Sequence, residues 1–310
     1  MNRTSEKELE LSIIIAAYNS AKTLRHCLQS VLSSSFSNYE IIVVDDGSSD
    51  STSEIAREFT TSVFRFDENQ GRNIARRFGY SKARAPIIVN LDSDIVIAPD
   101  TLRKLMHLVE TDPDEVKVWA GYLAKPLLKP GIAEFMKELK LHRIHSSCRS
   151  NAGFLYGGFF AFDASLVPLL RSDAAYADDT EMGLAFSERG HRIEFREELQ
   201  VHHLKRYGLI ALFMDELRMA FDWPAIFFRR RLWNPSERTA ALMRHFLRHL
   251  FSLKVCKIFL QEKGLYGLLL CFLLYLITIP AIILGTLGGT LFECTRMIPL
   301  LGVRKDSPAV

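Results

Sequence analysis

Short apolar runs alternate with amphipathic segments along the first third of the chain. Four runs rich in Ile, Val and Phe are predicted to be buried strands, and they cover residues 11–19, 39–46, 63–66 and 86–94. Between them, apolar residues recur at helical spacing, which places Leu32 on the inner face of one predicted helix and Ile74 on the inner face of another. Strands that alternate with helices of this length predict an α/β fold with a mainly parallel sheet.

The second of these runs ends abruptly in polar residues. Four consecutive Ile and Val residues, 41–44, precede Asp45, Asp46 and Gly47, so a strand buried on both faces ends in two acids. Open α/β sheets bind ligands at the carboxyl ends of such strands, although a solvated turn would have the same composition. The spacing of Ser51 and Glu54 predicts a capping box that opens the next helix.

A second acidic turn follows the run that begins at Pro86. Asp92 and Asp94 are separated by one small residue, so both carboxylates can face one point. Such a pair suits Mg²⁺ or Mn²⁺, which takes oxygen ligands and shares them with a phosphate. An acid-rich surface turn is the alternative. The shared sheet edge with Asp45 and Asp46 favours the metal site.

Composition limits the classes of protein without defining one. The 310 residues are 48% hydrophobic and carry a net charge of +3, which gives no indication of a nucleic-acid partner. The five cysteines are widely spaced and no pair has metal-ligand or redox spacing, which indicates reduced thiols in the cytoplasm. Residues 1–10 are polar, so they are not expected to form a signal peptide.

Four motifs in order resemble those of family-2 glycosyltransferases, over about two thirds of the chain, roughly Leu11 to His203. They are Tyr18-Asn19, residues 44–48, Asn69-Gln70-Gly71 with Ala75-Arg76, and residues 91–94. The resemblance implies the nucleotide-sugar-binding fold called GT-A, a Rossmann-like mainly parallel sheet with flanking helices, as the catalytic domain over residues 1–210. It also implies inverting transfer of a sugar from a nucleoside diphosphate, with a divalent metal that bridges the diphosphate.

The resemblance assigns the donor side of the site residue by residue. Tyr18 and Asp46 match residues that hold the base and ribose, and Arg76 matches an arginine near the nucleotide. Asp92 and Asp94 match the acids that bind metal and sugar. The donor is expected to be a UDP-sugar rather than a GDP-sugar, and the acceptor a glycan or a lipid-linked saccharide. The chain departs from the family at Arg77, where Asn is common, and Asp45 is expected to support the turn.

Residues 176–184 resemble the acidic motif of the family at a helix start. The match gives Asp179 the role of catalytic base, with Asp178 and Glu181 as support. Helix capping by these acids is the simpler reading, and it is compatible with catalysis. In the fold that the resemblance implies, a histidine near this place often completes the metal site, so one of His202 and His203 is a candidate metal ligand. Side chains alternate along a strand, so only one of the two can face the site.

The last third of the chain has a different character. Residues 211–263 mix aromatic and basic side chains, which indicates a membrane interface or a helix packed on the catalytic domain. Residues 264–292 contain no charge and are long enough to cross the roughly 30 Å hydrocarbon core as a helix, or as a hairpin around Pro280. A tail, 293–310, follows. Lys and Arg crowd the preceding side, which predicts a membrane-associated protein with its catalytic domain in the cytoplasm.

Other classes of protein remain as alternatives. No Gln-x-x-Arg-Trp motif is present, so a processive synthase is not expected. A haloacid-dehalogenase-type phosphatase would use Asp92 and Asp94, but that motif belongs on the first strand of its sheet. A dehydrogenase is disfavoured because no Gly-x-Gly-x-x-Gly follows a strand. The third alternative is a catalytically silent, membrane-bound module that binds a nucleotide sugar.

Overall fold

The computed structural model describes residues 9–123, 155, 158–170 and 178–204, with isolated positions between 210 and 284. The chain divides into two compact units. The first comprises Met1–Pro130 and Lys140–Arg206, and the second comprises Gly131–Leu139 and Tyr207–Val310. The elements described below belong to the first unit.

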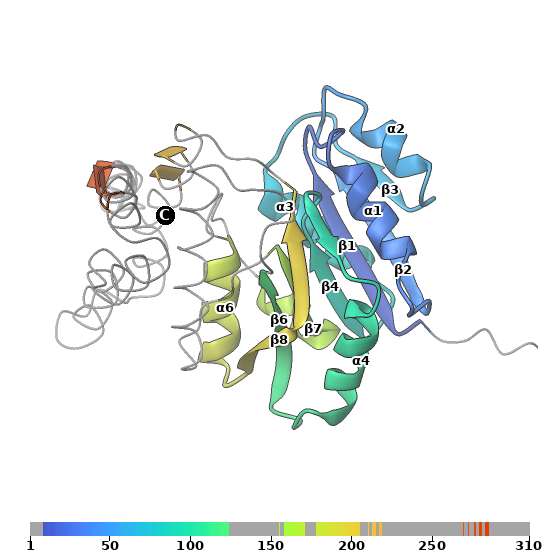
Figure 1. The fold of residues 1–310 in the computed structure, drawn as a ribbon, viewed down its shortest axis with the longest axis vertical. Coiled ribbons are helices and arrows are strands. Elements are labelled where there is room, and N and C mark those ends of the chain that lie inside the picture. Colours follow the sequence, from blue (N-terminus) through green and yellow to red (C-terminus); the bar gives the residue numbers. More distant parts are fainter. Residues whose placement is uncertain are drawn as a thin grey trace, which may run out of the picture. The chain divides into compact units, whose positions relative to one another are not determined.

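Eight strands form one sheet in the described part of the first unit (Figure 1). They are β1 (Leu11–Ala17), β2 (Tyr39–Asp45), β3 (Val63–Arg65), β4 (Ile87–Leu91), β5 (Ile95–Ile97), β6 (Val116–Leu123), β7 (Phe159–Asp163) and β8 (Arg192–His203). The helices are α1 (Leu24–Leu32), α2 (Thr52–Arg57), α3 (Arg72–Lys82), α4 (Thr101–Thr111), the 3₁₀ helix η1 (Ala164–Leu169) and α6 (Asp178–Glu188).

The sheet is parallel in its first half and mixed in its second. Its strand order is β3-β2-β1-β4-β7-β6-β8-β5, and the first four strands in this order run parallel. Strand β7 is antiparallel to both β4 and β6, and β5 is antiparallel to β8. The predicted α/β fold is therefore confirmed. The predicted mainly parallel arrangement holds only for the half of the sheet that contains the two acidic turns.

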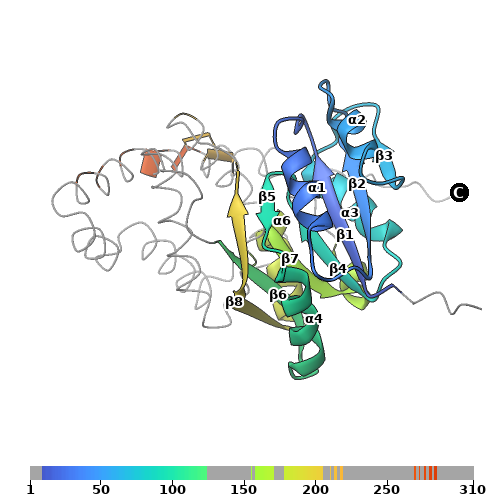
Figure 2. The same cartoon turned by 45° about the vertical axis from the view of Figure 1, so that its right-hand side comes forward.

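The sheet curls back on itself. Only residues 92–94 separate β4 from β5, yet β5 lies four places from β4 in the strand order, at the edge of the sheet beside β8. A flat sheet would hold neighbouring strands about 4.8 Å apart and could not place β5 so far from β4 within three residues. The curl therefore brings the carboxyl end of β8 to the turn between β4 and β5 (Figure 2).

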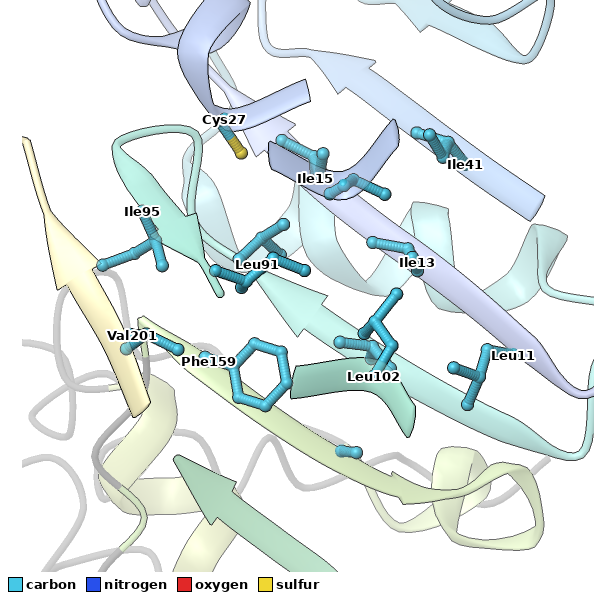
Figure 3. Close-up of a cluster of buried hydrophobic side chains, with 14 of the residues drawn as sticks. Leu11, Ile13, Ile15, Cys27, Ile41, Leu91, Ile95, Leu102, Phe159 and Val201 are labelled. Carbon is cyan, nitrogen blue, oxygen red and sulfur yellow. The ribbon is translucent and has the colours of Figure 1, made fainter. Parts of the chain in front are cut away.

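Helices cover both faces of the sheet, so the core has two layers. On one face, α1 and α4 bury Leu28 and Leu102 against odd-numbered β1 residues such as Ile13 (Figure 3). On the other face, α3 and α6 contribute Ala75 and Phe186, which join a cluster with Ile14 of β1. Burial on both faces explains why the strands are continuous runs of Ile and Val rather than alternating patterns.

Three local predictions are wrong. Leu32 is 53% exposed and Ile74 is 45% exposed, although helical spacing placed both on inner faces. Polar Asn73 and Arg76 occupy buried positions of α3 instead, because this helix faces the acidic turns. The capping box is not formed, since the Ser51 side chain makes no capping bond and Asp50 Oδ1 accepts from the Thr52 amide at 3.1 Å.

The predicted regions 211–263, 264–292 and 293–310 lie almost entirely outside the described residues. Where single positions are described, those between 269 and 284 are helical. None of the helices formed by the described positions has the length and apolarity needed to cross a bilayer. The membrane segment therefore stays a prediction.

Candidate active site

The turns after β1 and β2 are tied together by hydrogen bonds. Asn19 adopts a left-handed conformation with φ of 48°, and its amide donates to Ser48 Oγ at 2.9 Å. Its side-chain oxygen accepts from the Ser49 amide at 2.9 Å. Asp50 Oδ2 accepts from the Ala21 amide at 3.1 Å. These contacts make a single platform from two strand ends, next to the strand β4 that carries the second acidic turn.

Asp45 supports the turn after β2, which is the role that the resemblance gave it. Its carboxylate is fully buried, and Oδ1 accepts from the Ser48 amide at 2.9 Å. Oδ2 accepts from the Ser53 hydroxyl, and the Arg65 guanidinium lies 3.9 Å away. Asp45 therefore shapes the platform from inside the protein.

Asp46 is also buried, at 2% exposure, although the resemblance places it against the nucleotide. Its two carboxylate oxygens accept from the Gln70 amide at 2.8 Å and the Gly71 amide at 2.9 Å. Burial raises the pKa of Asp46 and the charge of Asp45 adds to this, while the two amide hydrogen bonds act in the opposite direction. In this arrangement Asp46 holds the segment that leads into α3.

Arg76 lies inside the protein and pairs with an acid of the second turn. Its side chain is 2% exposed, and Nη2 donates to Asp92 Oδ1. A guanidinium remains charged at any physiological pH, so burial at this site requires an anionic partner. The Asp92 side chain keeps 25% exposure, and its carboxylate is therefore shared between the protein and the solvent side of the turn.

The Asp92-Ser93-Asp94 turn is held from three sides. The Asp92 amide donates to the Gly158 carbonyl at 2.8 Å, and the Cys27 thiol donates to the Asp92 carbonyl at 3.5 Å. Ser93 Oγ lies 2.8 Å from Ser20 Oγ, which connects this turn to the end of β1. Burial raises the pKa of the Cys27 thiol, and the charges of Asp94 and Asp92 raise it further. Figure 3 shows Cys27 beside Leu91 and Ile95, at the two strand ends that this turn joins.

Asp94 and His203 meet at the end of the curled sheet. Asp94 Oδ2 lies 3.5 Å from His203 Nε2, and the Asp94 carbonyl accepts from the Leu204 amide at 2.8 Å. Both side chains are about one fifth exposed. His202 pairs in register with Val96, and His203 pairs with Ile95 next to the acidic turn. Of the two predicted histidines, the structure brings His203 to the acids.

The donor atoms at this position fit a divalent cation. Carboxylate oxygens from Asp92 and Asp94 and an imidazole nitrogen from His203 are ligands that Mn²⁺ accepts. Within the described part of the chain, no three His, Cys, Asp or Glu side chains converge closely enough to form a complete metal centre. Mg²⁺ and Mn²⁺ sites of this kind are completed by substrate phosphates, so an incomplete protein shell is the expected form.

The remaining predicted residues lie on two other elements. Tyr18 follows β1 and is 50% exposed, so its ring is open to a ligand. Asp179 lies in the first turn of α6, partly buried, as the motif at a helix start predicted. Glu181 is 4% exposed on the same helix. The role of Asp179 as the catalytic base stays a prediction.

Sequence reasoning did not find four side chains that shape the site, namely Ser20, Cys27, Asp50 and Ser93. Each acts through a partner that is distant in sequence, such as Ser20 with Ser93 and Cys27 with Asp92. Only Asp50 had a signal in the sequence, because an Asp two residues before a helical Thr is typical of an Asx turn.

Comparison with solved structures identifies the class of protein that this fold defines. A mannosyltransferase from Pyrobaculum calidifontis, PcManGT, solved with GDP-Man and Mn²⁺, superposes with a TM-score of 0.59 at 16% identity, over 96% of this chain and 81% of its own. S. aureus TarS 1–349 in complex with UDP-GlcNAc superposes with a TM-score of 0.51 at 18% identity, over 88% and 82%. At these identities the likeness concerns the fold alone, and that fold is GT-A.

The sequence gives the family. Residues 12–167, which are 156 of the 310, match Glycosyl transferase family 2. The chain belongs to this family, and its first unit carries a glycosyltransferase domain. The haloacid-dehalogenase alternative is thereby excluded for Asp92, which also follows the fourth strand of the chain rather than the first.

Curated relatives agree over the same part of the chain. The putative glycosyltransferase EpsH of Bacillus subtilis is 36% identical over 110 residues, which are 34% of this chain and 32% of EpsH. The glycosyltransferase AglE of Haloferax volcanii is 41% identical over 91 residues, which are 27% of this chain and 30% of AglE. The matches therefore span about a third of the length of these relatives.

Proposed function

We propose that this protein transfers a sugar from a nucleoside-diphosphate sugar to an acceptor hydroxyl, with inversion, with a divalent cation and without processive polymerisation. The observation that carries the proposal is the pairing of His203 with Asp94 at one end of the curled sheet, where His203 Nε2 lies 3.5 Å from Asp94 Oδ2, two residues after Asp92. Diphosphate is a poor leaving group without charge neutralisation, and carboxylate and imidazole side chains are donors that a divalent cation accepts.

The residues divide the chemistry between donor and acceptor. Tyr18 is available to the base or ribose, and Asp92 and Asp94 with His203 would hold the cation. When bound, the cation neutralises the negative charge that develops on the departing diphosphate. Asp179 takes the proton of the acceptor hydroxyl as its oxygen attacks the anomeric carbon. The bond to the diphosphate breaks on the opposite face, which inverts the configuration of that carbon.

The donor is proposed to be a UDP-sugar and the acceptor a glycan or a lipid-linked saccharide. Glucosyl-3-phosphoglycerate synthase of Mycobacterium tuberculosis, a further neighbour with a TM-score of 0.53, was solved with Mn²⁺ and UDP, which supports the nucleoside diphosphate and the cation. PcManGT was solved with GDP-Man, so the base of the nucleotide has to be measured.

Membrane attachment with the catalytic unit on the cytoplasmic side is part of the proposal. The uncharged stretch 264–292 exceeds the roughly 30 Å hydrocarbon core when helical. Large apolar side chains described in this stretch are exposed by more than half: Leu269, Phe272, Leu276, Ile283 and Leu284. Exposed apolar side chains at helical spacing support contact with lipid.

A chain truncated after Arg238 is expected to leave the membrane without detergent. If it still requires detergent, the attachment lies in residues 211–238.

The function is tested by two measurements on the same full-length preparation. Thermal shifts with a panel of nucleotide sugars, with and without Mn²⁺, identify the donor, and transfer to saccharide and lipid-linked acceptors then measures turnover. Stabilisation by one donor only with Mn²⁺, followed by transfer with inverted configuration, is the expected result. Donor binding without transfer to any acceptor would favour the silent binding module instead.

A further inference from the structure

Strand β8 changes its register against β6 partway along its length. Ala120 of β6 pairs with Phe195 of β8, and Tyr122 pairs with Gln200. Two steps along β6 therefore correspond to five steps along β8, so residues 196–199 form a bulge that contains three extra residues. Beyond this β8 bulge, the strand also pairs with β5, next to the second acidic turn.

The β8 bulge reverses the faces of the sheet to which alternate residues of the strand point. Before the bulge, Ile193 belongs to the core layer that contains Phe186 of α6. After it, Leu199 and Val201 belong to the opposite layer, which contains Leu102 of α4 (Figure 3). In a regular strand all odd-numbered residues share one face, so these residues could not lie in different layers. An odd number of extra residues produces this reversal, because the period of a strand is two.

The reversal decides which of the two histidines reaches the acids. His203 is odd-numbered and follows the phase of Leu199 and Val201, and its Nε2 lies 3.5 Å from Asp94 Oδ2. If the strand continued regularly from its first half, the even-numbered His202 would take this face instead. The phase of β8 is therefore as important for this contact as the pairing with β5.

An ion pair holds the first residue of the β8 bulge. Arg196 Nη2 donates to Asp112 Oδ1 at 2.6 Å, and Asp112 directly follows α4. Trp119 of β6 donates through Nε1 to Asp112 Oδ2 at 2.8 Å. The Asp112 side chain is 10% exposed and that of Arg196 is 26% exposed, so water and salt screen this pair less than a surface pair. The bulge is thereby tied to both α4 and β6.

A glycine makes room for the last residue of the β8 bulge. Leu199 is fully buried, and a Cβ at Gly121 of β6 would lie 3.0 Å from the Leu199 carbonyl oxygen. The same Cβ would lie 2.7 Å from Phe159 Cδ1 and 3.2 Å from the Phe159 carbonyl oxygen. Glycine in a strand interior allows such a close approach of main chains. The next residue is also held, since the Gln200 carbonyl accepts from the Thr101 hydroxyl at 3.4 Å.

We propose that the β8 bulge brings His203 to the acidic turn, and that Gly121 and Arg196, which hold the two ends of the bulge, are positioning residues for this histidine. The inference rests on the proposed function, because it takes His203 to be a ligand of the cation. Loosening either end of the bulge is then expected to weaken cation binding through the position of His203.

The test is the apparent affinity of the full chain for Mn²⁺ at saturating UDP, read from thermal shifts. Gly121→Ala and Arg196→Gln are each expected to lower this affinity by about tenfold, the scale for groups that orient a metal ligand. In a His203→Gln background, each should lower it by no more than about twofold further, because both act through His203. Parent-like affinity in both variants would overturn the proposal, as would effects that multiply with that of His203→Gln.

Two control variants separate positioning from a general loss of stability. Gly190→Ala places a side chain at φ of 83° in the turn before β8, and Arg192→Gln removes an exposed arginine at the start of the strand. Both are expected to lower stability without disturbing the bulge, so the affinity for Mn²⁺ should be unchanged. If the controls lost as much affinity as Gly121→Ala, the affinity would follow overall stability and the proposal would be rejected.

Metal-free crystal structures of the parent and the variants show the position of the histidine directly. The parent is expected to keep His203 beside Asp94, and Gly121→Ala is expected to displace Leu199 and separate the pair. If Gly121→Ala does not fold, Arg196→Gln takes its place. An unchanged distance between His203 and Asp94 would contradict the proposal. If the parent binds no Mn²⁺ with UDP, the proposed function fails, and these structures still decide the role of the bulge.

Discussion

His203 Nε2 lies 3.5 Å from Asp94 Oδ2, although the two residues are 109 positions apart in the sequence. The contact exists because β5 follows the acidic turn and pairs antiparallel with the last residues of β8. The pairing places His203 opposite Ile95, immediately after Asp94, while His202 lies opposite Val96. Successive side chains of a strand point to opposite faces, so only one histidine can serve the acids.

His203→Gln is therefore expected to lower the apparent affinity for Mn²⁺ by about tenfold, the scale typical of groups at a metal site. This affinity is read from the Mn²⁺-dependent stabilisation of the protein by UDP. Thermal shift as a function of Mn²⁺ concentration at saturating UDP measures this. His202→Gln is the matched control and should behave as the parent. Asp94→Asn should abolish the Mn²⁺ dependence while the protein stays folded. Equal effects of the two histidine variants would remove His203 from the site.

Asp179→Asn is expected to separate donor binding from transfer. Asparagine keeps the size and the capping ability of the side chain but cannot accept the proton of the attacking hydroxyl. Donor affinity should stay near that of the parent, and turnover should fall by roughly a hundredfold or more. Donor affinity and transfer rate are measured on the same preparation. Parent-like transfer would exclude Asp179 as the base, and lost donor binding would make its role structural.

Gly47→Ala is expected to destabilise the protein more than Gly190→Ala does. Both glycines have positive φ, 74° and 83°, so each substitution carries a backbone strain of about 1 kcal/mol. A Cβ at position 47 would also lie 2.4 Å from the Glu68 carbonyl carbon, whereas position 190 has open space. The excess destabilisation should be about 1–3 kcal/mol. Urea unfolding measures both variants, and equal midpoints would show that residues 68–69 move aside freely.

The acid side of the stability profile should depend on Glu40. Burial alone raises the pKa of Glu40, but hydrogen bonds from Arg84 and Ser12 outweigh it and hold the pKa below the ordinary value of 4.5. A carboxylate with a lowered pKa adds stability at pH values above the ordinary one, and this stability is lost as the pH falls through the lowered value. Glu40→Gln should therefore cost about 1–2 kcal/mol at pH 7 and progressively less below pH 4.5.

The measurement for Glu40 is the free energy of unfolding of parent and variant between pH 7 and pH 3. Glu58→Gln is a suitable control, because it removes an ion pair with Arg25 in which both side chains are well exposed. Water and salt screen such a pair, so the control should have the smaller effect. If the difference in the free energy of unfolding between the parent and Glu40→Gln stays constant down to pH 3, the charge of Glu40 does not contribute to stability.

The sequence by itself was sufficient for the local elements and for the position of the acids along the chain. Continuous Ile and Val runs predicted β1, β2 and β4, because strands covered on both faces need apolar side chains at every position. The same pattern placed Asp45 and Asp92 at strand ends, and a helix does begin beside Asp179. These features depend on residues that are close together in the sequence, so the spacing of those residues predicts them.

Tertiary structure decided which polar groups meet and which are buried. Nothing near Asp46 in sequence indicates that the amides of Gln70 and Gly71 would occupy its oxygens, and helical spacing could not show that Arg76 would be buried beneath Asp92. The choice of His203 over His202 required the register of β8 against β5, which follows from the curl of the sheet. Long-range pairing depends on how whole layers pack, and a one-dimensional pattern of apolar and polar residues does not contain that information.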